Sequence, residues 1–256
     1  MSSLQKMLRI LDLFTIDQQV ISLDNIVDKL NISIPTAYRY IKELIDAGLL
    51  AKVESGEYIL GPKIIKLDRF LRSSDPIINK GKRYMHELAE LTGLVVLLSN
   101  IYNDEIINIY TIPSAGRKIN IKYDRGTPQP LFRGSTSRII VANLPRNRLI
   151  RLYNEHNSHI EEIGIGSSWQ QFYSYFSKIK REGYSLSHGE LDDDISGIAA
   201  PIFFGSQIIG SLTIALNTSQ IEIFNMDKMI SLLIEAADKI SKDISNNIEI
   251  EENKNT

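Results

Sequence analysis

Residues 33–60, SIPTAYRYIKELIDAGLLAKVESGEYIL, contain the strongest secondary-structure signals of the N-terminal region. Ser33 is a residue type that favours the cap position of a helix, and Gly48 is one that favours the position just after a helix. Apolar residues between them recur three or four positions apart, as on the buried face of a helix: Ala37, Ile41 and Leu44. These features predict a helix from Ser33 to about Ala47.

A β-hairpin is predicted directly after this helix. Residues 49–53 and 58–60 are short apolar runs, and the residues between them, ESGE, favour a turn. Two shorter helices are predicted upstream from the same helical spacing, at residues 4–11 and 23–30, the second capped by Ser22. Three helices followed by a hairpin are the order of a winged helix-turn-helix, whose third helix enters the major groove of DNA.

The outward face of the third helix supplies candidate DNA contacts. Its polar and aromatic residues also recur three or four positions apart, so they share a face. Basic residues on the hairpin and after it are candidates for phosphate contacts. The candidate DNA-binding residues are Ser33, Pro35, Thr36, Tyr38, Arg39, Lys42, Lys52 and Lys63. The alternative is a small helical interaction domain with a solvated polar face, and the ordered set of helices and hairpin favours DNA binding.

The connection after the hairpin is predicted to be a helix with one apolar face, formed by Ile64, Leu67 and Leu71. That face indicates a partner helix, although it could instead pack on its own domain. Asp75-Pro76 is a strong signal for the start of the next helix. The expected domains are a winged helix-turn-helix at 1–62, a linker helix at 63–74, a second domain at 75–248 and a disordered acidic tail at 249–256.

From Leu94 the apolar pattern changes to the alternation typical of β-strands. Strands are predicted at residues 94–100, 105–111, 118–123, 184–187, 198–203 and 208–215. Helices are predicted after Ser135-Thr136, around the aromatic stripe Trp169, Phe172, Tyr173, Phe176 and Ile179, and between Met229 and Ile240. The aromatic stripe is predicted to be core rather than a cofactor site. Strands with flanking helices predict an α+β domain.

Composition limits the class of protein. The chain has 256 residues, of which 43% are hydrophobic and 23% charged, as in a folded protein of two domains. It has no cysteine, which excludes disulfide frameworks, thiolate metal sites and a cysteine nucleophile. No apolar run approaches the roughly 20 residues that span a bilayer, so we expect a cytoplasmic protein without a membrane partner. With a net charge of −2, DNA affinity must come from where basic residues lie.

Several segments resemble a known family. LQKMLRIL at 4–11, ISIPTAYRYI at 32–41 and YILG at 58–61 resemble the DNA-binding domain of the IclR family of transcriptional regulators. REGYSLSHGE at 181–190 and GIAAPIF at 197–203 are similar to the signature of its effector domain. The resemblance covers roughly residues 3–245. It implies a C-terminal GAF-like antiparallel sheet with flanking helices that binds a small effector molecule.

The resemblance also implies which residues line the effector pocket: Ser135, Thr136, Ser187, Gly197, Thr213 and Ala215. Backbone amides at the start of a helix favour an anion, and nearby hydroxyls fix its orientation, so we expect a small carboxylate. On the residues alone, a helix cap at Ser135 and a strand position at Thr213 are the simpler interpretation.

These features together predict a regulator that binds a palindromic operator in double-stranded DNA as a homodimer or a dimer of dimers, without a cofactor. The alternative is a sensor or enzyme whose N-terminal domain recruits protein. His156 and His159, near Glu161 and Glu162, lack a metal-ligand spacing, and the acidic residues at 190–194 favour a solvated loop over acid–base catalysis. No catalytic or metal-binding residue is therefore expected.

Overall fold

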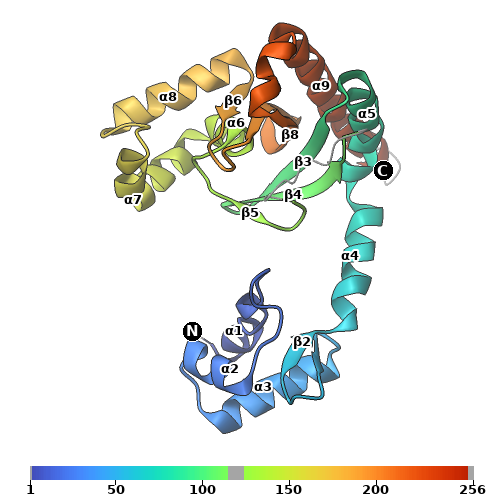
Figure 1. Ribbon diagram of the computed structural model, residues 1–256, viewed down its shortest axis with the longest axis vertical. Coiled ribbons are helices and arrows are strands. Elements are labelled where there is room, and N and C mark those ends of the chain that lie inside the picture. Colours follow the sequence, from blue (N-terminus) through green and yellow to red (C-terminus); the bar gives the residue numbers. More distant parts are fainter. Residues whose placement is uncertain (1, 115–123, 253–256) are drawn as a thin grey trace. The chain divides into compact units, whose positions relative to one another are not determined.

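The computed structural model describes residues 2–114 and 124–252. The chain divides into two compact units, Met1–Asp75 and Pro76–Thr256 (Figure 1). The division falls at the Asp75-Pro76 pair, where the sequence predicts that one helix ends and the next begins. Each unit is built around its own core.

The N-terminal unit is a winged helix-turn-helix, as predicted. Ser22 caps its second helix, because the Ser22 hydroxyl accepts a hydrogen bond from the Asn25 amide at 3.2 Å and the Asn25 side chain accepts one from the Ser22 amide at 3.3 Å. Asn31 then ends that helix in a left-handed conformation. The elements are α1 (Ser3–Leu8), η1 (Leu11–Leu13), α2 (Leu23–Leu30), α3 (Ile34–Asp46), β1 (Leu50–Lys52), β2 (Tyr58–Leu60) and α4 (Pro62–Ser74).

The first helix differs from its prediction. The spacing predicts one helix over residues 4–11, but α1 ends at Leu8 and a short 3₁₀ turn follows. Because the helix stops, the residues after it rotate, and Ile10 becomes fully buried. Leu4 and Leu8 remain 68% and 52% exposed. The apolar stripe of the sequence is thus divided between the core and the surface.

The C-terminal unit contains a six-stranded antiparallel sheet in the order β5-β4-β3-β8-β7-β6. This confirms the predicted α+β fold, with flanking helices on an antiparallel sheet. The predicted strand at 118–123 lies outside the described residues. The elements are α5 (Pro76–Thr92), β3 (Val95–Tyr102), β4 (Glu105–Ile112), β5 (Pro128–Gln129), α6 (Ser135–Ala142), α7 (Arg146–Glu162), α8 (Trp169–Glu182), β6 (Ser185–His188), β7 (Ile195–Phe204), β8 (Gln207–Asn217), η2 (Thr218–Ile223) and α9 (Met226–Glu252).

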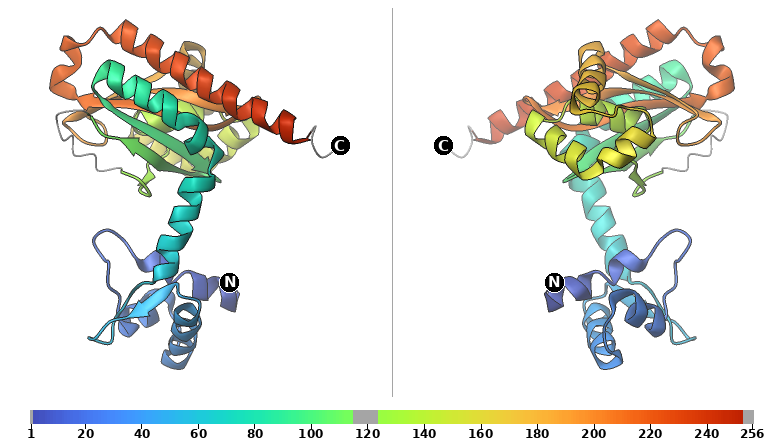
Figure 2. Two further views of the ribbon diagram at one scale, coloured as in Figure 1. Left: turned by 90° about the vertical axis from the view of Figure 1, so that its right-hand side faces the viewer. Right: turned by 90° about the vertical axis from the view of Figure 1, so that its left-hand side faces the viewer.

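Helices cover both faces of this sheet (Figure 2). Helices α5 and α9 pack on one face around Leu98 and Leu212, whereas α6 and α8 pack on the other. Phe172, Phe176 and Ile179 of α8 are buried there, so these members of the aromatic stripe are core, as predicted, whereas Trp169 is half-buried and Tyr173 is 41% exposed. Each face of the sheet therefore has its own core. Some strand residues on the α6 side line a cavity instead of packing in that core.

Two elements depart from the sequence pattern. Helix α7 is not predicted by the apolar spacing, because its buried residues Leu149, Leu152 and Ile160 are separated by polar ones and the helix bends at His156. Helix α9 continues to Glu252, so the first four residues of the expected acidic tail belong to this helix. Residues 253–256 of that tail lie outside the described residues.

Candidate functional site

The outer face of α3 carries the central candidate DNA contacts. Ala37, Ile41 and Leu44 are buried in the core, which turns Arg39 and Lys42 to solvent and leaves Tyr38 55% exposed. Basic and aromatic side chains on an exposed helix face are the groups that reach base edges and phosphates in the major groove. The structure therefore places the central candidate DNA contacts together on one accessible face.

The first turn of α3 adds three of the candidates. Ser33 occupies the cap position, but its hydroxyl lies 2.9 Å from the hydroxyl of Thr36 and does not accept from the helix backbone. Pro35 lies in the first turn, where its missing amide costs no helical hydrogen bond. The helix thus begins with an exposed hydroxyl pair beside the face that carries Arg39.

The hairpin presents Lys52 and an acidic tip. Lys52 is exposed at the end of β1, whereas the turn between the strands carries Glu54 and Glu57. Negative charge repels the DNA backbone, so Lys52 rather than the tip is the candidate phosphate contact. Lys63 is also exposed, in the first turn of α4.

Gly61 fixes the path of the chain between the hairpin and α4. A Cβ at this position would lie 2.2 Å from the carbonyl oxygen of Gly48, which no side chain tolerates. The Gly61 amide donates to the Leu49 carbonyl at 2.8 Å, and the Lys63 amide donates to the Gly48 carbonyl at 3.1 Å. These contacts join the start of α4 to the end of α3, so the Leu-Gly that closes the hairpin has a structural reason.

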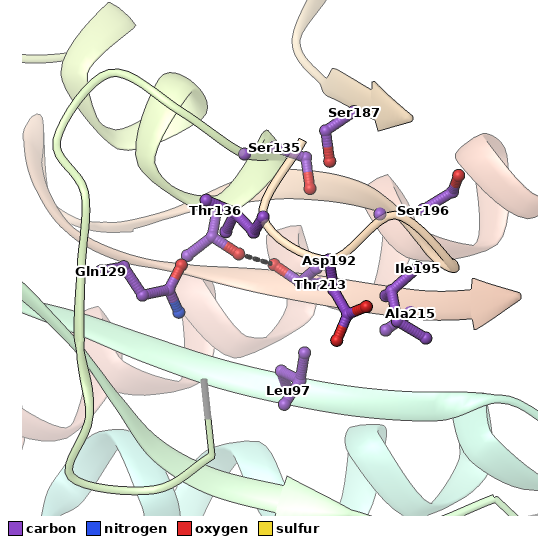
Figure 3. Close-up of a pocket in the computed structure, with 13 residues that line it drawn as sticks. Leu97, Gln129, Ser135, Thr136, Ser187, Asp192, Ile195, Ser196, Thr213 and Ala215 are labelled. Atoms are coloured by element: carbon purple, nitrogen blue, oxygen red, sulfur yellow. Dashed lines mark hydrogen bonds between the residues drawn. The ribbon is translucent and has the colours of Figure 1, made fainter. Parts of the chain in front are cut away.

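The C-terminal unit contains a cavity between the sheet and the start of α6 (Figure 3). Its empty volume is about 520 Å³, with the solvent at its mouth included. All six residues that the resemblance implies line it, and they come from α6, β6, β7 and β8. The lining residues are Leu97, Gln129, Gly134, Ser135, Thr136, Ser187, Leu191, Asp192, Ile195, Ser196, Gly197, Thr213 and Ala215.

Hydroxyl groups crowd the inner wall of this cavity. The hydroxyls of Thr136 and Thr213 lie 2.8 Å apart and hydrogen-bond to each other. Gly197 faces two more, because a Cβ at Gly197 would lie 2.5 Å from the Ser135 hydroxyl oxygen and 3.3 Å from that of Ser187. The absence of a side chain at Gly197 therefore keeps room for both serine hydroxyls.

Gly134, and not Ser135, caps helix α6. Gly134 has a φ of 80°, a conformation that favours glycine, and Ser135 is the first helical residue. The Gly134 amide donates to the Glu190 carboxylate at 3.1 Å, so a carboxylate of the protein already occupies the cap position. The following amides, those of Ser135 and Thr136, have no intrahelical acceptor because they lie in the first turn.

Glu190 also holds the loop that covers the cavity. Its carboxylate accepts a hydrogen bond from Arg138 at 2.5 Å, and Arg133 donates to its carbonyl oxygen. The Arg138 guanidinium lies over the ring of Tyr175, and burial raises the pKa of this tyrosine despite the nearby cation. The acidic segment at 190–194 is therefore more than the solvated loop that its composition indicates.

The sequence patterns miss several lining residues. Leu97 is the register partner of Thr213, so a correct strand alignment would have identified it. Gln129 lies on the two-residue strand β5, which is too short to give a sequence signal. Asp192 lies in the acidic segment, where nothing in the sequence separates it from its solvated neighbours.

Two further observations concern the residues 2–114 and 124–252. Within these ranges, no group of three or more His, Cys, Asp or Glu side chains could hold a metal ion. The Nδ1 atom of His159 and a carboxylate oxygen of Glu162 lie 3.4 Å apart, as a local pair on α7. No helix in the described part of the chain is long and apolar enough to cross a membrane.

Comparison with known proteins identifies the class. Residues 3–54 match the IclR helix-turn-helix domain, and residues 70–242 match the bacterial transcriptional regulator IclR C-terminal domain. The fold, the exposed recognition helix and these matches define a DNA-binding transcriptional regulator rather than an enzyme. The chain belongs to the IclR family.

Individual relatives agree with this assignment. The chain is 24% identical over 223 residues to the HTH-type transcriptional regulator XynR of Escherichia coli, covering 86% of this chain and 88% of XynR. It is 24% identical over 215 residues to KipR of Bacillus subtilis, covering 82% and 84%. Both relatives are described as HTH-type transcriptional regulators.

Solved structures share the fold. An IclR transcriptional regulator from Alicyclobacillus acidocaldarius superposes with a TM-score of 0.78 at 23% identity, covering 95% of this chain and 98% of that one. An IclR homologue from Microbacterium hydrocarbonoxydans, complexed with 4-hydroxybenzoate, superposes with a TM-score of 0.72 at 19% identity, covering 95% and 99%.

Proposed function

We propose that this regulator binds a palindromic DNA operator through α3 and that a small carboxylate in the C-terminal cavity changes its operator affinity. The observation that carries the proposal is the cavity itself. Ser135, Thr136, Ser187 and Thr213 come from three separate elements, yet all four line one cavity beside the start of a helix. An operator-binding role also places the protein in the cytoplasm, where the DNA is.

The start of helix α6 is the part of the cavity that favours a carboxylate over an uncharged ligand, and it acts against the negative charge of Asp192 in the lining. The amides of Ser135 and Thr136 lie at the positive end of α6, which favours negative charge. The carboxylate of Glu190 already accepts a hydrogen bond from the neighbouring Gly134 amide, which supports the proposal. A distant relative of the same fold was crystallised with 4-hydroxybenzoate, itself a carboxylate.

The proposed assembly is a homodimer or a dimer of dimers. One winged helix-turn-helix reads only a few base pairs, so a palindromic operator needs two copies. Helix α4 has no buried residue and exposes the apolar side chains Ile65, Leu67, Phe70 and Leu71. The predicted pairing face included Ile64, but Ile64 is half-buried, so Leu67 and Leu71 are the stronger candidates on this face.

A ligand changes operator affinity only by binding the DNA-competent and incompetent states unequally, with a typical coupling of about 1–3 kcal/mol. The coupling is reciprocal, so the operator must change ligand affinity by the same factor. This requirement separates an effector from a ligand that merely stabilises the fold.

A thermal-shift screen of small carboxylates on the full chain, with 4-hydroxybenzoate among them, tests the ligand proposal. A carboxylate that raises the melting temperature should fail to do so in Gly197→Ala, whose new methyl would meet Ser135 and Ser187. The matched control is Gly81→Ala on the opposite face of the sheet, where the nearest atom to a Cβ is 3.4 Å away. Equal shifts in Gly197→Ala and wild type would place the ligand elsewhere.

A further inference from the structure

A second cleft lies at the other end of helix α6. It is formed by the α6–α7 connection, the outer face of α8 and the turn between β7 and β8, and it shares no lining residue with the effector cavity. Its empty volume is about 1030 Å³, with the solvent at its mouth included. The lining residues are Ala142, Asn143, Leu144, Pro145, Arg146, Leu149, Tyr173, Ser177, Lys180, Ser206, Gln207 and Ile208.

The charged side chains that line this cleft are all basic. Arg146 and Lys180 are its charged lining residues, and neither forms an ion pair with any residue that the structure describes. Their neighbours do form such pairs, because Lys178 contacts Glu182 at 3.9 Å and Arg148 contacts Asp104 at 2.9 Å. Two cations that converge on one concave surface without a protein counter-ion create a positive potential there.

Arg146 is held in position by its surroundings. Its guanidinium lies 5.7 Å from the ring centroid of Tyr173, within the range of a cation–π contact. Arg146 is also the first residue of the 17-residue helix α7, whose cap residue Pro145 supplies no side-chain hydrogen bond to the helix. The positive end of α7 therefore adds to the two side-chain charges.

The rest of the lining would complete an anion site. Ser177, Ser206 and Gln207 supply hydrogen-bond donors around the cations, and Leu149 and Ile208 are buried beneath them. We propose that this cleft binds an oxyanion, the phosphate or carboxylate group of a small metabolite, with Arg146 and Lys180 as the charged contacts. Arg146 is suited to such a group because its planar guanidinium can donate two parallel hydrogen bonds.

The single tryptophan of the chain gives a direct readout. Trp169 lies 5.4 Å from Tyr173, centroid to centroid, and Tyr173 lines the cleft beneath Arg146. An anion that binds Arg146 should therefore change Trp169 fluorescence. The probe is inorganic phosphate, titrated into the full chain at constant ionic strength so that screening does not change.

The proposal expects a saturable fluorescence change in wild type that Arg146→Gln and Lys180→Gln each weaken about tenfold or more. Lys178→Gln is the matched control, because this exposed lysine lies two residues from Lys180 on the same helix and outside the cleft. Gly197→Ala should also respond as wild type, which separates this site from the effector cavity. Absence of saturation in wild type at about 10 mM phosphate, or equal midpoints in wild type and both cleft variants, would overturn the proposal.

Discussion

The hydroxyl oxygens of Thr136 and Thr213 lie 2.8 Å apart and join helix α6 to strand β8 at the inner wall of the cavity in the C-terminal unit. Both side chains are buried, with 5% and 3% of their surface exposed. A buried hydroxyl pair is favourable only while both members are present, because each satisfies the other in the absence of water. The pair therefore stabilises the domain and shapes the cavity at the same time.

Replacement of one threonine should cost more than replacement of both. Thr213→Val leaves the Thr136 hydroxyl buried without this partner and should lower the free energy of unfolding by about 1–3 kcal/mol. Thr136→Val/Thr213→Val removes both polar groups with little change of shape and should recover part of that loss. Urea denaturation of the two single variants and the double variant checks this, and strictly additive losses would show that the hydroxyls do not interact.

The contact between Gly197 and Ser135 predicts a specific rescue. Gly197→Ala should destabilise the domain by about 1–3 kcal/mol, because its methyl would lie 2.5 Å from the Ser135 hydroxyl oxygen. Ser135→Ala in the same chain removes that oxygen and leaves the Ser135 Cβ at 3.7 Å, an ordinary contact distance. Thermal denaturation should show a higher melting temperature for the double variant than for Gly197→Ala alone, and a lower one would contradict this geometry.

Glu190 is predicted to hold the loop over the cavity mouth. Glu190→Ala removes the acceptor for the Gly134 amide and for Arg138, and it should lower the free energy of unfolding by about 1–2 kcal/mol. The control is Asp193→Ala in the same loop, whose exposed side chain should contribute little. Similar denaturation midpoints for both variants would exclude a role for Glu190 in holding this loop.

The apolar face of α4 predicts the assembly. Leu67→Glu/Leu71→Glu places two charges where the proposed partner helix packs, so this variant should be monomeric by light scattering at micromolar concentration while wild type is dimeric or larger. Leu91→Glu is the control, because Leu91 is also an exposed leucine, at 68%, but belongs to a different helix, α5. A wild-type protein that is monomeric both with and without DNA would contradict the proposal that it assembles as a dimer.

The proposed DNA contacts are tested by the affinity of variants for duplex DNA and by how that affinity depends on salt concentration. Arg39→Ala should cost about 1–3 kcal/mol of binding to a preferred duplex and relax specificity at one position, if its guanidinium reads a base edge. Lys52→Ala should weaken binding to all sequences alike and reduce the salt slope by about one. Band shifts over a range of salt concentrations give both the loss of binding free energy and the salt slope. Unchanged affinity in Arg39→Ala/Lys42→Ala would refute the assignment of α3 as the helix that contacts the bases.

The sequence predicts most of the fold because its signals are local. The capping residue Ser22, the terminator Gly48 and the alternation around Thr213 each act over a few residues, and the structure confirms the elements that they predict. Helix α7 escapes prediction because its stability comes from a few separated contacts, such as Leu152 against the core, rather than from a regular apolar face.

The candidate cavity is predictable only in part. Its serines and threonines could be proposed from the family resemblance, but whether Ser135 faces Gly197 depends on how α6 lies on the sheet. The role of Glu190 depends on a contact with Gly134, a residue 56 positions away in the chain. Interactions between residues so far apart are set by packing, and no single stretch of sequence encodes them.

Control of DNA binding by the cavity is tested by the affinity of the full chain for its operator, measured with and without the effector. The operator would be selected from a random duplex library, and the ligand would be the carboxylate that raises the melting temperature of wild type but not of Gly197→Ala. Fluorescence anisotropy should then give an operator Kd that changes by about 5- to 150-fold at saturating ligand. A Kd that stays the same at saturating ligand would contradict the claim that this cavity controls DNA binding.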